Sequence, residues 1–456
     1  MEQVTVRDIV EATGGRLLCG NPDMEIKGFS IDSREGQEDY LFVPIIGEKV
    51  DAHRFIEGAL KINGATLTSE HDEMDDEKPW IRVEDTVKAM QNIGTAYRNR
   101  LNLPVVAVTG SVGKTTTREM IAWALASEKK VFQTIGNQNS QIGVPLTLSR
   151  MTEDDEAAVL EIGMSERGQI ETLTKMIRPN IAVVTVIGVS HIMQLKSQEN
   201  ICLEKMDIIK GLPENGKVFL NGDDPFLIKY KGKLGFDTYF YGLSEDCDYR
   251  AENIYQDDEG MDFEFVIQGE PACKVRLNVL GDHNVKNALA ALGICHQMGV
   301  SVKNAARALT FFHGQRQKIV KTNGYTLIED AYNASPDSMK AALSVLASMD
   351  GRKIAVLADM LELGEQEKEF HETVGKFLGQ VKIDELYCTG PLSRYIMAGA
   401  KKENPAVKAE HFEDNDALGT FLEAYLTQGD SVLIKGSNGM KLSEVIKRLE
   451  GPTKED

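Results

Sequence analysis

The sequence lacks several features that would point to a membrane, a nucleic acid or an oxidising compartment. Its longest apolar run, residues 181–189, is far shorter than the ~20 residues of a membrane-spanning helix. The first residues, MEQVTVRDIVEATGG, contain no basic segment followed by an apolar one, so we expect no secretion signal. The cysteines form no CxxC pair, which favours free thiols in a reducing cytoplasm over disulfides or zinc ligands. The net charge of −19 leaves no basic stripe to neutralise nucleic-acid phosphates.

What is present is typical of a globular protein with more than one domain. A chain of 456 residues is too long for a single core, and 42% of its residues are apolar. In the first hundred residues, the short runs FSIDSR, YLFVPI and WIRV favour strands, and residues 85–99 favour a helix. The segment LNLP at residues 101–104 is a predicted boundary. We therefore predict an N-terminal domain at residues 1–100.

From Val105 onward, apolar strands alternate with helices, which is typical of a parallel sheet covered on both faces. The predicted strands are VVAVTG, KVFQT, AAVLEIG, IAVVTVIG (residues 181–188) and KVFLN, and residues 247–279 alternate as an antiparallel insertion would. A second alternating series, YTLIED, KIAVLAD, ELYCTG and SVLIKGS, follows the segment HGQR. We predict an α/β protein with a mostly parallel central sheet, a central domain at residues 101–314 and a C-terminal domain at residues 315–456.

The segment VVAVTGSVGKTTT, residues 105–117, predicts a nucleotide triphosphate site. Gly110 and Gly113 free backbone N–H groups to surround phosphates, Lys114 can reach the β- and γ-phosphates, and the Thr115 hydroxyl can bind Mg²⁺. Val108 stands where the GxxxxGK(S/T) pattern has its first glycine. The residues expected to contact ATP are Thr109, Gly110, Ser111, Val112, Gly113, Lys114, Thr115 and Thr116.

Polar residues that follow the predicted strands are further candidates, because ligands bind outside the carboxyl ends of parallel strands. Glu161 ends an apolar strand and predicts a Mg²⁺ ligand, with a loop-capping acid as the alternative. His191 follows the next strand, and its position favours function over a structural histidine. Lys205 has no local feature that distinguishes it from a solvated helix face. Asn287 could pair with an adenine edge, and capping by Asn284 is the alternative reading of that segment.

Several segments together resemble the Mur ligases of peptidoglycan synthesis, over nearly the whole chain. They are DSRE at residues 32–35, LFVPIIGEKVDAH at 41–53, GNQNSQIGVPLTLSR at 136–150, EDAYNASPDSMKAAL at 329–343, LADMLELGE at 357–365 and LIKGSNGMKL at 433–442. These segments are most similar to the branch that joins D-alanyl-D-alanine to UDP-N-acetylmuramoyl-tripeptide. The DNPR-type motif of neighbouring branches is absent from the sequence.

The resemblance implies a small α/β domain for the UDP end, a central ATPase and a Rossmann-like C-terminal domain. It implies that the tripeptide carboxylate takes the γ-phosphoryl group of ATP and that the dipeptide amine attacks the acyl phosphate. Lys114, His191 and Lys205 would be catalytic, and Lys205 would be carbamylated. Thr115, Glu161, His191 and Lys205 would hold Mg²⁺; Asn287, Arg316 and Asp330 would contact adenosine or bridge two domains; and Ser33, Arg34, Asn137, Asn139, Ser140, Asn333 and Lys435 would contact the substrates. A monomer is expected.

The sequence departs from the family pattern at four positions. Val186 and Ser140 stand where asparagines are usual, Ala52 replaces the glycine of a DGH motif, and Asn438 replaces the arginine of KGSR. The alternatives are another Mur-type ligase, a folylpolyglutamate-synthetase-like enzyme or a P-loop small-molecule kinase. A further alternative is a partner-dependent Mur-like subunit, whose four-cysteine zinc ribbon the scattered cysteines cannot form. The third residue of the tripeptide, diaminopimelate or lysine, is left open.

Overall fold

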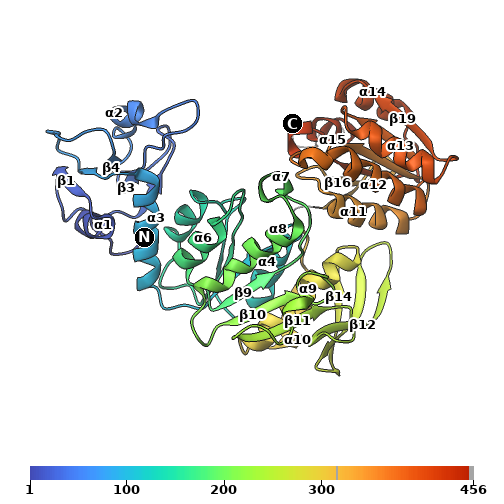
Figure 1. Cartoon of the computed structure of the whole chain (residues 1–456), viewed down its shortest axis with the longest axis horizontal. Coiled ribbons are helices and arrows are strands. Elements are labelled where there is room, and N and C mark those ends of the chain that lie inside the picture. Colours follow the sequence, from blue (N-terminus) through green and yellow to red (C-terminus); the bar gives the residue numbers. More distant parts are fainter. Residues whose placement is uncertain (315–316, 451–456) are drawn as a thin grey trace. The chain divides into compact units, whose positions relative to one another are not determined.

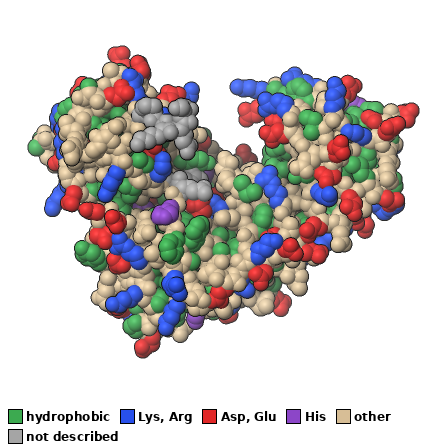
Figure 2. Space-filling view, turned by 180° about the vertical axis from the view of Figure 1, so that it is seen from behind, with side chains coloured by type: hydrophobic (Ala, Val, Ile, Leu, Met, Phe, Trp, Pro, Cys, Tyr) green, Lys and Arg blue, Asp and Glu red, His purple; other side chains and the backbone are tan. Residues whose placement is uncertain are grey.

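The computed structural model describes residues 1–314 and 317–450, and it confirms an α/β protein with three sheets (Figure 1). The described chain forms two compact units. One comprises residues 1–109, 129–183 and 206–218, and the other residues 110–128, 184–205 and the chain from 219 onward. No described helix has both the length and the apolar character needed to cross a bilayer. Figure 2 shows acidic and basic side chains interspersed over the visible face.

The N-terminal sheet has the strand order β1-β5-β4-β3-β2, and only β1 runs antiparallel to its neighbour. Its strands are β1 (Arg16–Cys19), β2 (Gly28–Ser30), β3 (Tyr40–Phe42), β4 (Ala65–Thr68) and β5 (Trp80–Arg82). The helices are α1 (Val6–Thr13), η1 (Ala52–Phe55), α2 (Ile56–Ala59) and α3 (Thr86–Arg100). A capping box of Thr5 and Asp8 starts α1, and Gly14 ends it at φ 66°. The predicted helix at 85–99 is thus confirmed as α3.

The nine-stranded central sheet has the order β14-β13-β12-β11-β10-β9-β6-β8-β7. Its strands are β6 (Val105–Thr109), β7 (Val131–Gln133), β8 (Ala157–Glu161), β9 (Ile181–Val184), β10 (Lys217–Asn221), β11 (Asp237–Gly242), β12 (Tyr249–Gln256), β13 (Met261–Ile267) and β14 (Glu270–Leu277). The pairs β6–β8 and β7–β8 are parallel, whereas β12, β13 and β14 are antiparallel as predicted for the insertion. All residues of β6 and β8 are buried, which explains their continuous apolar sequence.

The helices that accompany this sheet are α4 (Lys114–Leu125), α5 (Gly143–Leu148), α6 (Gln169–Ile177), α7 (Ile192–Leu195), α8 (Gln198–Met206), η2 (Asp207–Gly211), η3 (Ile228–Tyr230), α9 (Asp282–Gln297) and α10 (Val302–Leu309). The prediction that one strand extends over residues 181–188 is wrong at its end, because β9 stops at Val184. Beyond it, the Thr185 hydroxyl donates to the Val112 carbonyl, and the Val186 carbonyl accepts from the Ser111 N–H. The Thr185 hydroxyl and the Val186 carbonyl therefore bind the loop after β6 and do not extend the strand.

The C-terminal sheet has the order β15-β16-β20-β17-β18-β19, with β15 antiparallel and the remaining pairs parallel. Its strands are β15 (Lys318–Thr322), β16 (Tyr325–Asp330), β17 (Lys353–Ala358), β18 (Glu385–Thr389), β19 (Lys408–Phe412) and β20 (Ser431–Lys435). The helices are α11 (Pro336–Ser348), η4 (Gly364–Gln366), α12 (Glu367–Gln380), α13 (Ser393–Glu403), α14 (Asn415–Tyr425), η5 (Asn438–Met440) and α15 (Ser443–Glu450). One core joins the sheet to α11, α12 and α13, and another joins it to α14 and α15. Both faces of this sheet are therefore covered by helices.

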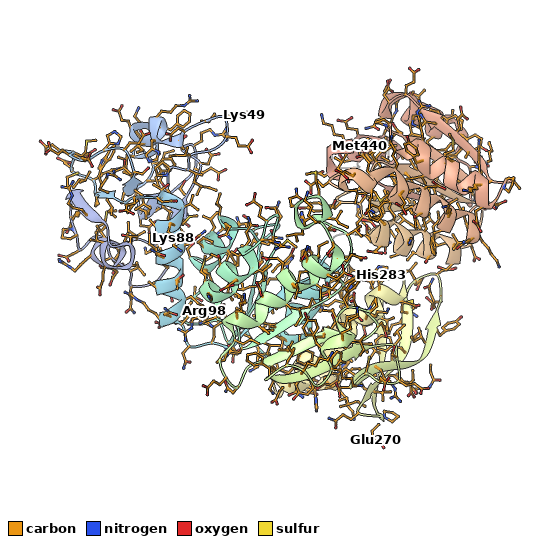
Figure 3. All side chains as sticks on the ribbon, viewed as in Figure 1. Lys49, Lys88, Arg98, Glu270, His283 and Met440 are labelled. Atoms are coloured by element: carbon orange, nitrogen blue, oxygen red, sulfur yellow. The ribbon has the colours of Figure 1, made fainter. Side chains whose placement is uncertain are left out.

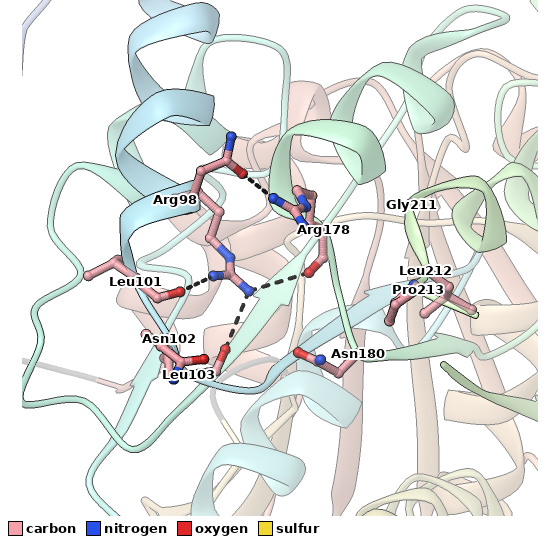
Figure 4. Close-up of a pocket in the computed structure, with 10 residues that line it drawn as sticks. Arg98, Leu101, Asn102, Leu103, Arg178, Asn180, Gly211, Leu212 and Pro213 are labelled. Carbon is pink, nitrogen blue, oxygen red and sulfur yellow. Dashed lines mark hydrogen bonds between the residues drawn. The ribbon is translucent and has the colours of Figure 1, made fainter. Parts of the chain in front are cut away.

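Arg98, near the end of α3, fastens the segment that leads into β6 (Figures 3 and 4). Its guanidinium donates to the carbonyls of Ile177, Leu101, Leu103 and Arg178, at 2.8, 2.7, 3.3 and 3.3 Å. Burial, and then the nearby charge of Arg178, lower the pKa of Arg98 to about 10. The helix end and the segment before β6 therefore share one buried cation.

Replacing Arg98 by Ala is expected to lower the free energy of unfolding by about 3 kcal/mol, because buried carbonyls would lose a charged donor. Arg100→Ala is the matched control, since Arg100 lies on the same helix and pairs with Asp8 at the surface. Its cost should stay below about 1 kcal/mol. Urea unfolding followed by circular dichroism measures both variants, and equal midpoints would contradict the assignment.

Candidate active site

The loop after β6 is built around two glycines that other residues could not replace. Gly110 has φ 153° and Gly113 has φ 84°, and a Cβ atom at Gly110 would lie 1.9 Å from the Thr185 Oγ1. The loop is seated on the chain after β9, because the Ser111 N–H donates to the Val186 carbonyl at 2.7 Å. The sequence therefore folds here into a fixed turn that leads directly into α4.

Two lysines point at the same backbone oxygen of this loop. Lys114 Nζ and Lys205 Nζ each donate to the Gly110 carbonyl at 2.9 Å. Lys205 is 2% exposed, so the alternative in which this lysine lies on a solvated helix face is wrong. Burial, and then the charge of Lys114, hold the pKa of Lys205 well below its usual value. A lysine in this state readily becomes the neutral amine, which is the reactive form.

His191 lies in the same compact unit as these lysines. It precedes α7 with a left-handed backbone, φ 64° and ψ 23°. Burial, followed by the charges of Lys205 and Lys114, lowers the pKa of His191 to about 4. The imidazole is therefore neutral near pH 7, as a metal-binding histidine must be.

Glu161 ends β8 and is 2% exposed. In the strand ladder it pairs with Val108, one residue before Thr109. Its Oε1 accepts from Asn139 Nδ2 at 2.7 Å, and its backbone N–H donates to Thr134 Oγ1 at 2.9 Å. The carboxylate is thus oriented by the GNQNSQIG segment, which the sequence linked only to substrate.

The loop fits a bound polyphosphate on three observations. The helix α4 begins after Gly113 with no side-chain cap hydrogen bond, and the positive end of the helix dipole at this point favours an anion. The Ser111 Oγ is buried and has no hydrogen-bond partner within the described part of the chain. Finally, the side chains of Lys114 and Lys205 meet at the Gly110 carbonyl, and a phosphate bound there would favour the charged form of both. Thr115 and Thr116 occupy the first turn of α4 and are half-buried.

Asn287 lies beside this loop on α9. Its Oδ1 accepts from Thr117 Oγ1 at 2.9 Å, and a Cβ at Gly113 would lie 3.2 Å from the same oxygen. The capping alternative for Asn284 is wrong, because its amide donates to the Leu280 carbonyl and the cap of α9 is Gly281. Asn287 therefore supports the start of α4, and its contact with adenine stays a prediction.

The C-terminal candidates lie at the carboxyl end of β16 and β20. Lys435 is 1% exposed and donates to Asp330 Oδ2 at 2.8 Å and to the Asn333 carbonyl at 3.0 Å. This ion pair joins two of the segments that the sequence singled out. Arg316 lies outside the described residues.

The N-terminal candidates are more exposed. Arg34 pairs with Asp32 through Nε and Nη2, at 2.9 and 2.6 Å, and this pair lowers the pKa of Asp32 to about 2. Ser33 is half-buried between them. Of the other substrate candidates, Ser140 accepts from the Gly143 N–H at 3.2 Å, and Asn137 is exposed.

Asp51, His53 and Glu70 form a cluster whose oxygen and nitrogen atoms lie within 4.8 Å of one another. His53 Nε2 accepts from the Ser69 N–H at 3.0 Å, and Nδ1 lies 2.7 Å from Asp51 Oδ1. Both ring nitrogens are therefore engaged within the protein. This histidine fixes the loop and offers no nitrogen to a cation.

Comparison with known proteins decides the family. The model of the Mur ligase middle domain matches residues 108–295, and that of the Mur ligase, glutamate ligase domain matches residues 315–438. The UDP-N-acetylmuramoyl-tripeptide–D-alanyl-D-alanine ligase of Bacillus subtilis is 38% identical over 98% of both chains. This protein belongs to the Mur ligase family.

Solved Mur ligases have the same fold. MurF from Acinetobacter baumannii superposes with a TM-score of 0.92 at 27% identity, covering 99% of this chain and 100% of that one. MurF ligase from Thermotoga maritima, solved in complex with ADP, gives 0.84 at 28% identity over 93% and 97%. The three-domain α/β architecture implied by the resemblance is thereby confirmed.

Three positions at which this Mur ligase departs from the family pattern can be examined in the structure, and one of them contacts the loop after β6. Val186 contributes its backbone carbonyl to Ser111, a hydrogen bond that does not depend on which side chain stands at this position. Ala52 lies in η1 next to His53, and its N–H donates to the Ile45 carbonyl. Asn438 is exposed at the start of η5, and nothing in the structure explains its replacement of an arginine.

Sequence reasoning missed Thr185 and Thr134 in this Mur ligase. Thr185 closes the space behind Gly110, and Thr134 binds the backbone of Glu161. Thr185 directly follows the apolar run IAVV of the buried strand β9, and this position was a signal that could have identified it. Thr134 follows the half-buried strand β7, and the sequence KVFQ before it offers no comparable signal.

Gly110→Ala is expected to lower ATP affinity at least about tenfold, because the new Cβ would displace Thr185 and strain the loop. Gly58→Ala is the control, since nothing lies within 4 Å of a Cβ there. Equilibrium binding of a fluorescent ATP analogue measures both. Equal affinities would show that the loop tolerates a side chain.

Proposed function

We propose that this Mur ligase joins D-alanyl-D-alanine to UDP-N-acetylmuramoyl-tripeptide, with ATP, in peptidoglycan precursor synthesis. The observation that carries the proposal is the glycine loop with Lys114 and the buried Lys205 on one of its carbonyls. Full-length relatives named for this reaction support the choice of substrates. The third sheet, with its Asp330–Lys435 pair, favours a ligase over a P-loop kinase, which needs no such domain.

In the proposed reaction the tripeptide carboxylate takes the γ-phosphoryl group of ATP and forms an acyl phosphate. The dipeptide amine then attacks the acyl carbon, and phosphate leaves. The N–H groups of Gly113 and Lys114 and the Lys114 ammonium would surround the phosphates, where charge spreads in the transition state. Thr109, Ser111, Val112 and Thr116 would complete the loop around them.

Mg²⁺ would neutralise phosphate charge while bound. Thr115, Glu161 and His191 would hold it, since a hydroxyl, a carboxylate and a neutral imidazole are all able to coordinate a divalent cation. Asn139 would orient the Glu161 carboxylate through its 2.7 Å hydrogen bond.

A carbamate on Lys205 would supply one more carboxylate to this site, as the family resemblance implies. The depressed pKa of Lys205 supports it, because carbon dioxide reacts with the neutral amine. Carbamylation would replace the Lys205 amine by a negatively charged carbamate, which would lie beside the Lys114 ammonium and attract it.

The decisive test incubates the protein with ATP, Mg²⁺, UDP-N-acetylmuramoyl-tripeptide and D-alanyl-D-alanine. We expect a pentapeptide product and phosphate release that depends on the dipeptide. Lys114→Ala should lower kcat at least about 100-fold, because a charge that stabilises the transition state is lost. Release of phosphate at the same rate without dipeptide, and without a new peptide, would refute the ligase. Repeating the assay with diaminopimelate or lysine as third residue defines the tripeptide.

Carbamylation is tested separately by ¹³C NMR in ¹³C-bicarbonate. The wild-type protein should give a carbamate resonance that is missing from Lys205→Gln. Lys196→Gln serves as control, because Lys196 is exposed nearby on the chain and should leave the resonance unchanged. A resonance that survives in Lys205→Gln would assign the carbamate elsewhere.

The remaining features of the proposal are a monomeric, cytoplasmic enzyme with domain boundaries near residues 100 and 314. Asn287, Asp330 and Arg316 are proposed for adenosine, and Ser33, Arg34, Asn137, Asn139, Ser140, Asn333 and Lys435 for the two substrates. The net charge of −19 supports solubility at high concentration without a partner.

A further inference from the structure

Two residues with strained backbones face each other in the second compact unit. His191 and Glu362 both have φ 64°, the left-handed region that residues other than glycine rarely adopt. Such conformations persist only where the surroundings hold them, and they are concentrated at functional positions. Glu362 belongs to the LADMLELGE segment, to which the proposed reaction assigns no task.

The contact between these residues is specific in its atoms. Glu362 Oε2 lies 3.7 Å from His191 Nδ1. A carboxylate on this side of the ring favours the tautomer with a proton on Nδ1 and leaves the lone pair of Nε2 for a cation. Carboxylates that accept a hydrogen bond from a metal-binding histidine orient its ring in many proteins. The 3.7 Å separation here is an electrostatic contact, one that a small side-chain rotation would shorten to a hydrogen bond.

The backbone that carries Glu362 is fixed by two side chains from other elements. The Met360 N–H donates to His371 Nε2 at 2.9 Å, and the Leu361 N–H donates to Ser437 Oγ at 3.0 Å. His371, on α12, is fully buried, and its Nδ1 donates to the Glu367 carbonyl at 2.6 Å. The backbone N–H groups of the two residues before Glu362 are therefore bound by side chains from two separate segments, α12 and the chain after β20.

The same hydrogen bonds join two segments that the sequence singled out. Ser437, in LIKGSNGMKL, also donates its N–H to the Asp359 carbonyl at 3.1 Å. The Asp359 side chain accepts in turn from the Ser393 N–H at 2.6 Å. The segments that follow β17, β18 and β20 are thus joined by hydrogen bonds. Glu362 lies in the first of them, and its side chain is 65% exposed.

We propose that Glu362 is a positioning residue for His191, and that His371 and Ser437 hold it in place. The proposal rests on the proposed function, in which His191 is a ligand of Mg²⁺. Glu362 would not touch the substrates; it would set the orientation of the imidazole that coordinates the cation.

The test compares Glu362→Ala with Glu365→Ala, a control on the same loop whose side chain is exposed. The readout is the Mg²⁺ concentration that half-maximally tightens binding of a non-hydrolysable ATP analogue, followed by kcat in the ligase assay. Loss of a residue that orients a metal ligand should raise that concentration about tenfold and lower kcat to a similar extent. Glu365→Ala should match the wild type. Equal values for the two variants would overturn the proposal.

The supporting residues are tested by His371→Leu, which removes the acceptor for Met360, and by His371→Gln, which keeps an acceptor. Amide exchange at Met360 and Leu361 should quicken in the leucine variant together with the tenfold Mg²⁺ shift, and glutamine should restore both. Faster exchange without the Mg²⁺ shift would overturn the role of His371. If His371→Leu fails to fold, Ser437→Ala decides the same point through the Leu361 amide.

Failure of the proposed function is distinguishable from failure of this inference. A wild-type protein that makes no pentapeptide would refute the ligase, whereas the Mg²⁺ dependence of nucleotide binding would still be measured. A shift in Glu362→Ala alone would then support the positioning role, and no shift would overturn it.

Discussion

The close approach of the Gly110 backbone to the end of β9 is the constraint on which the site depends. Only a glycine leaves room for the Thr185 hydroxyl, which in turn binds the Val112 carbonyl. The loop is therefore held in one shape by contacts within the protein. Such preorganisation is what makes fixed dipoles effective in stabilising a developing charge.

The loop also brings two lysine side chains to one backbone oxygen. The chain carries a net charge of −19, yet Lys114 and Lys205 meet at one carbonyl, and Lys205 is almost fully buried. Burying an ammonium group is costly unless it loses its proton or gains an anion. Both responses lead toward the proposed chemistry, because a neutral Lys205 can react with carbon dioxide and a phosphate can pair with Lys114.

The sequence predicted the strands of the parallel sheets well, because a strand that is buried on both faces has a continuous apolar sequence. It also singled out Glu161 and His191 as candidates, since Glu161 ends such a run and His191 follows one. It failed for Lys205, because helix α8 has no local pattern that distinguishes a buried lysine from a solvated one. Burial of that side chain is decided by the tertiary position of the Gly110 carbonyl, which lies 95 residues away in the sequence. The end of β9 was misplaced for a similar reason, since Thr185 and Val186 bind a distant loop.

Glu362 is a second residue whose environment depends on groups that are distant in the sequence. Its sequence neighbours Leu361 and Leu363 are apolar and give no sign of a left-handed backbone, which becomes visible only in the structure, where His371 and Ser437 accept from the two preceding amides. A fully buried neutral histidine that accepts from one backbone N–H and donates to another carbonyl cannot move without losing both hydrogen bonds. The rigidity of the loop thus comes from groups that are far apart in the chain. That rigidity fixes the backbone from which the carboxylate of Glu362, the proposed positioning residue, extends toward His191.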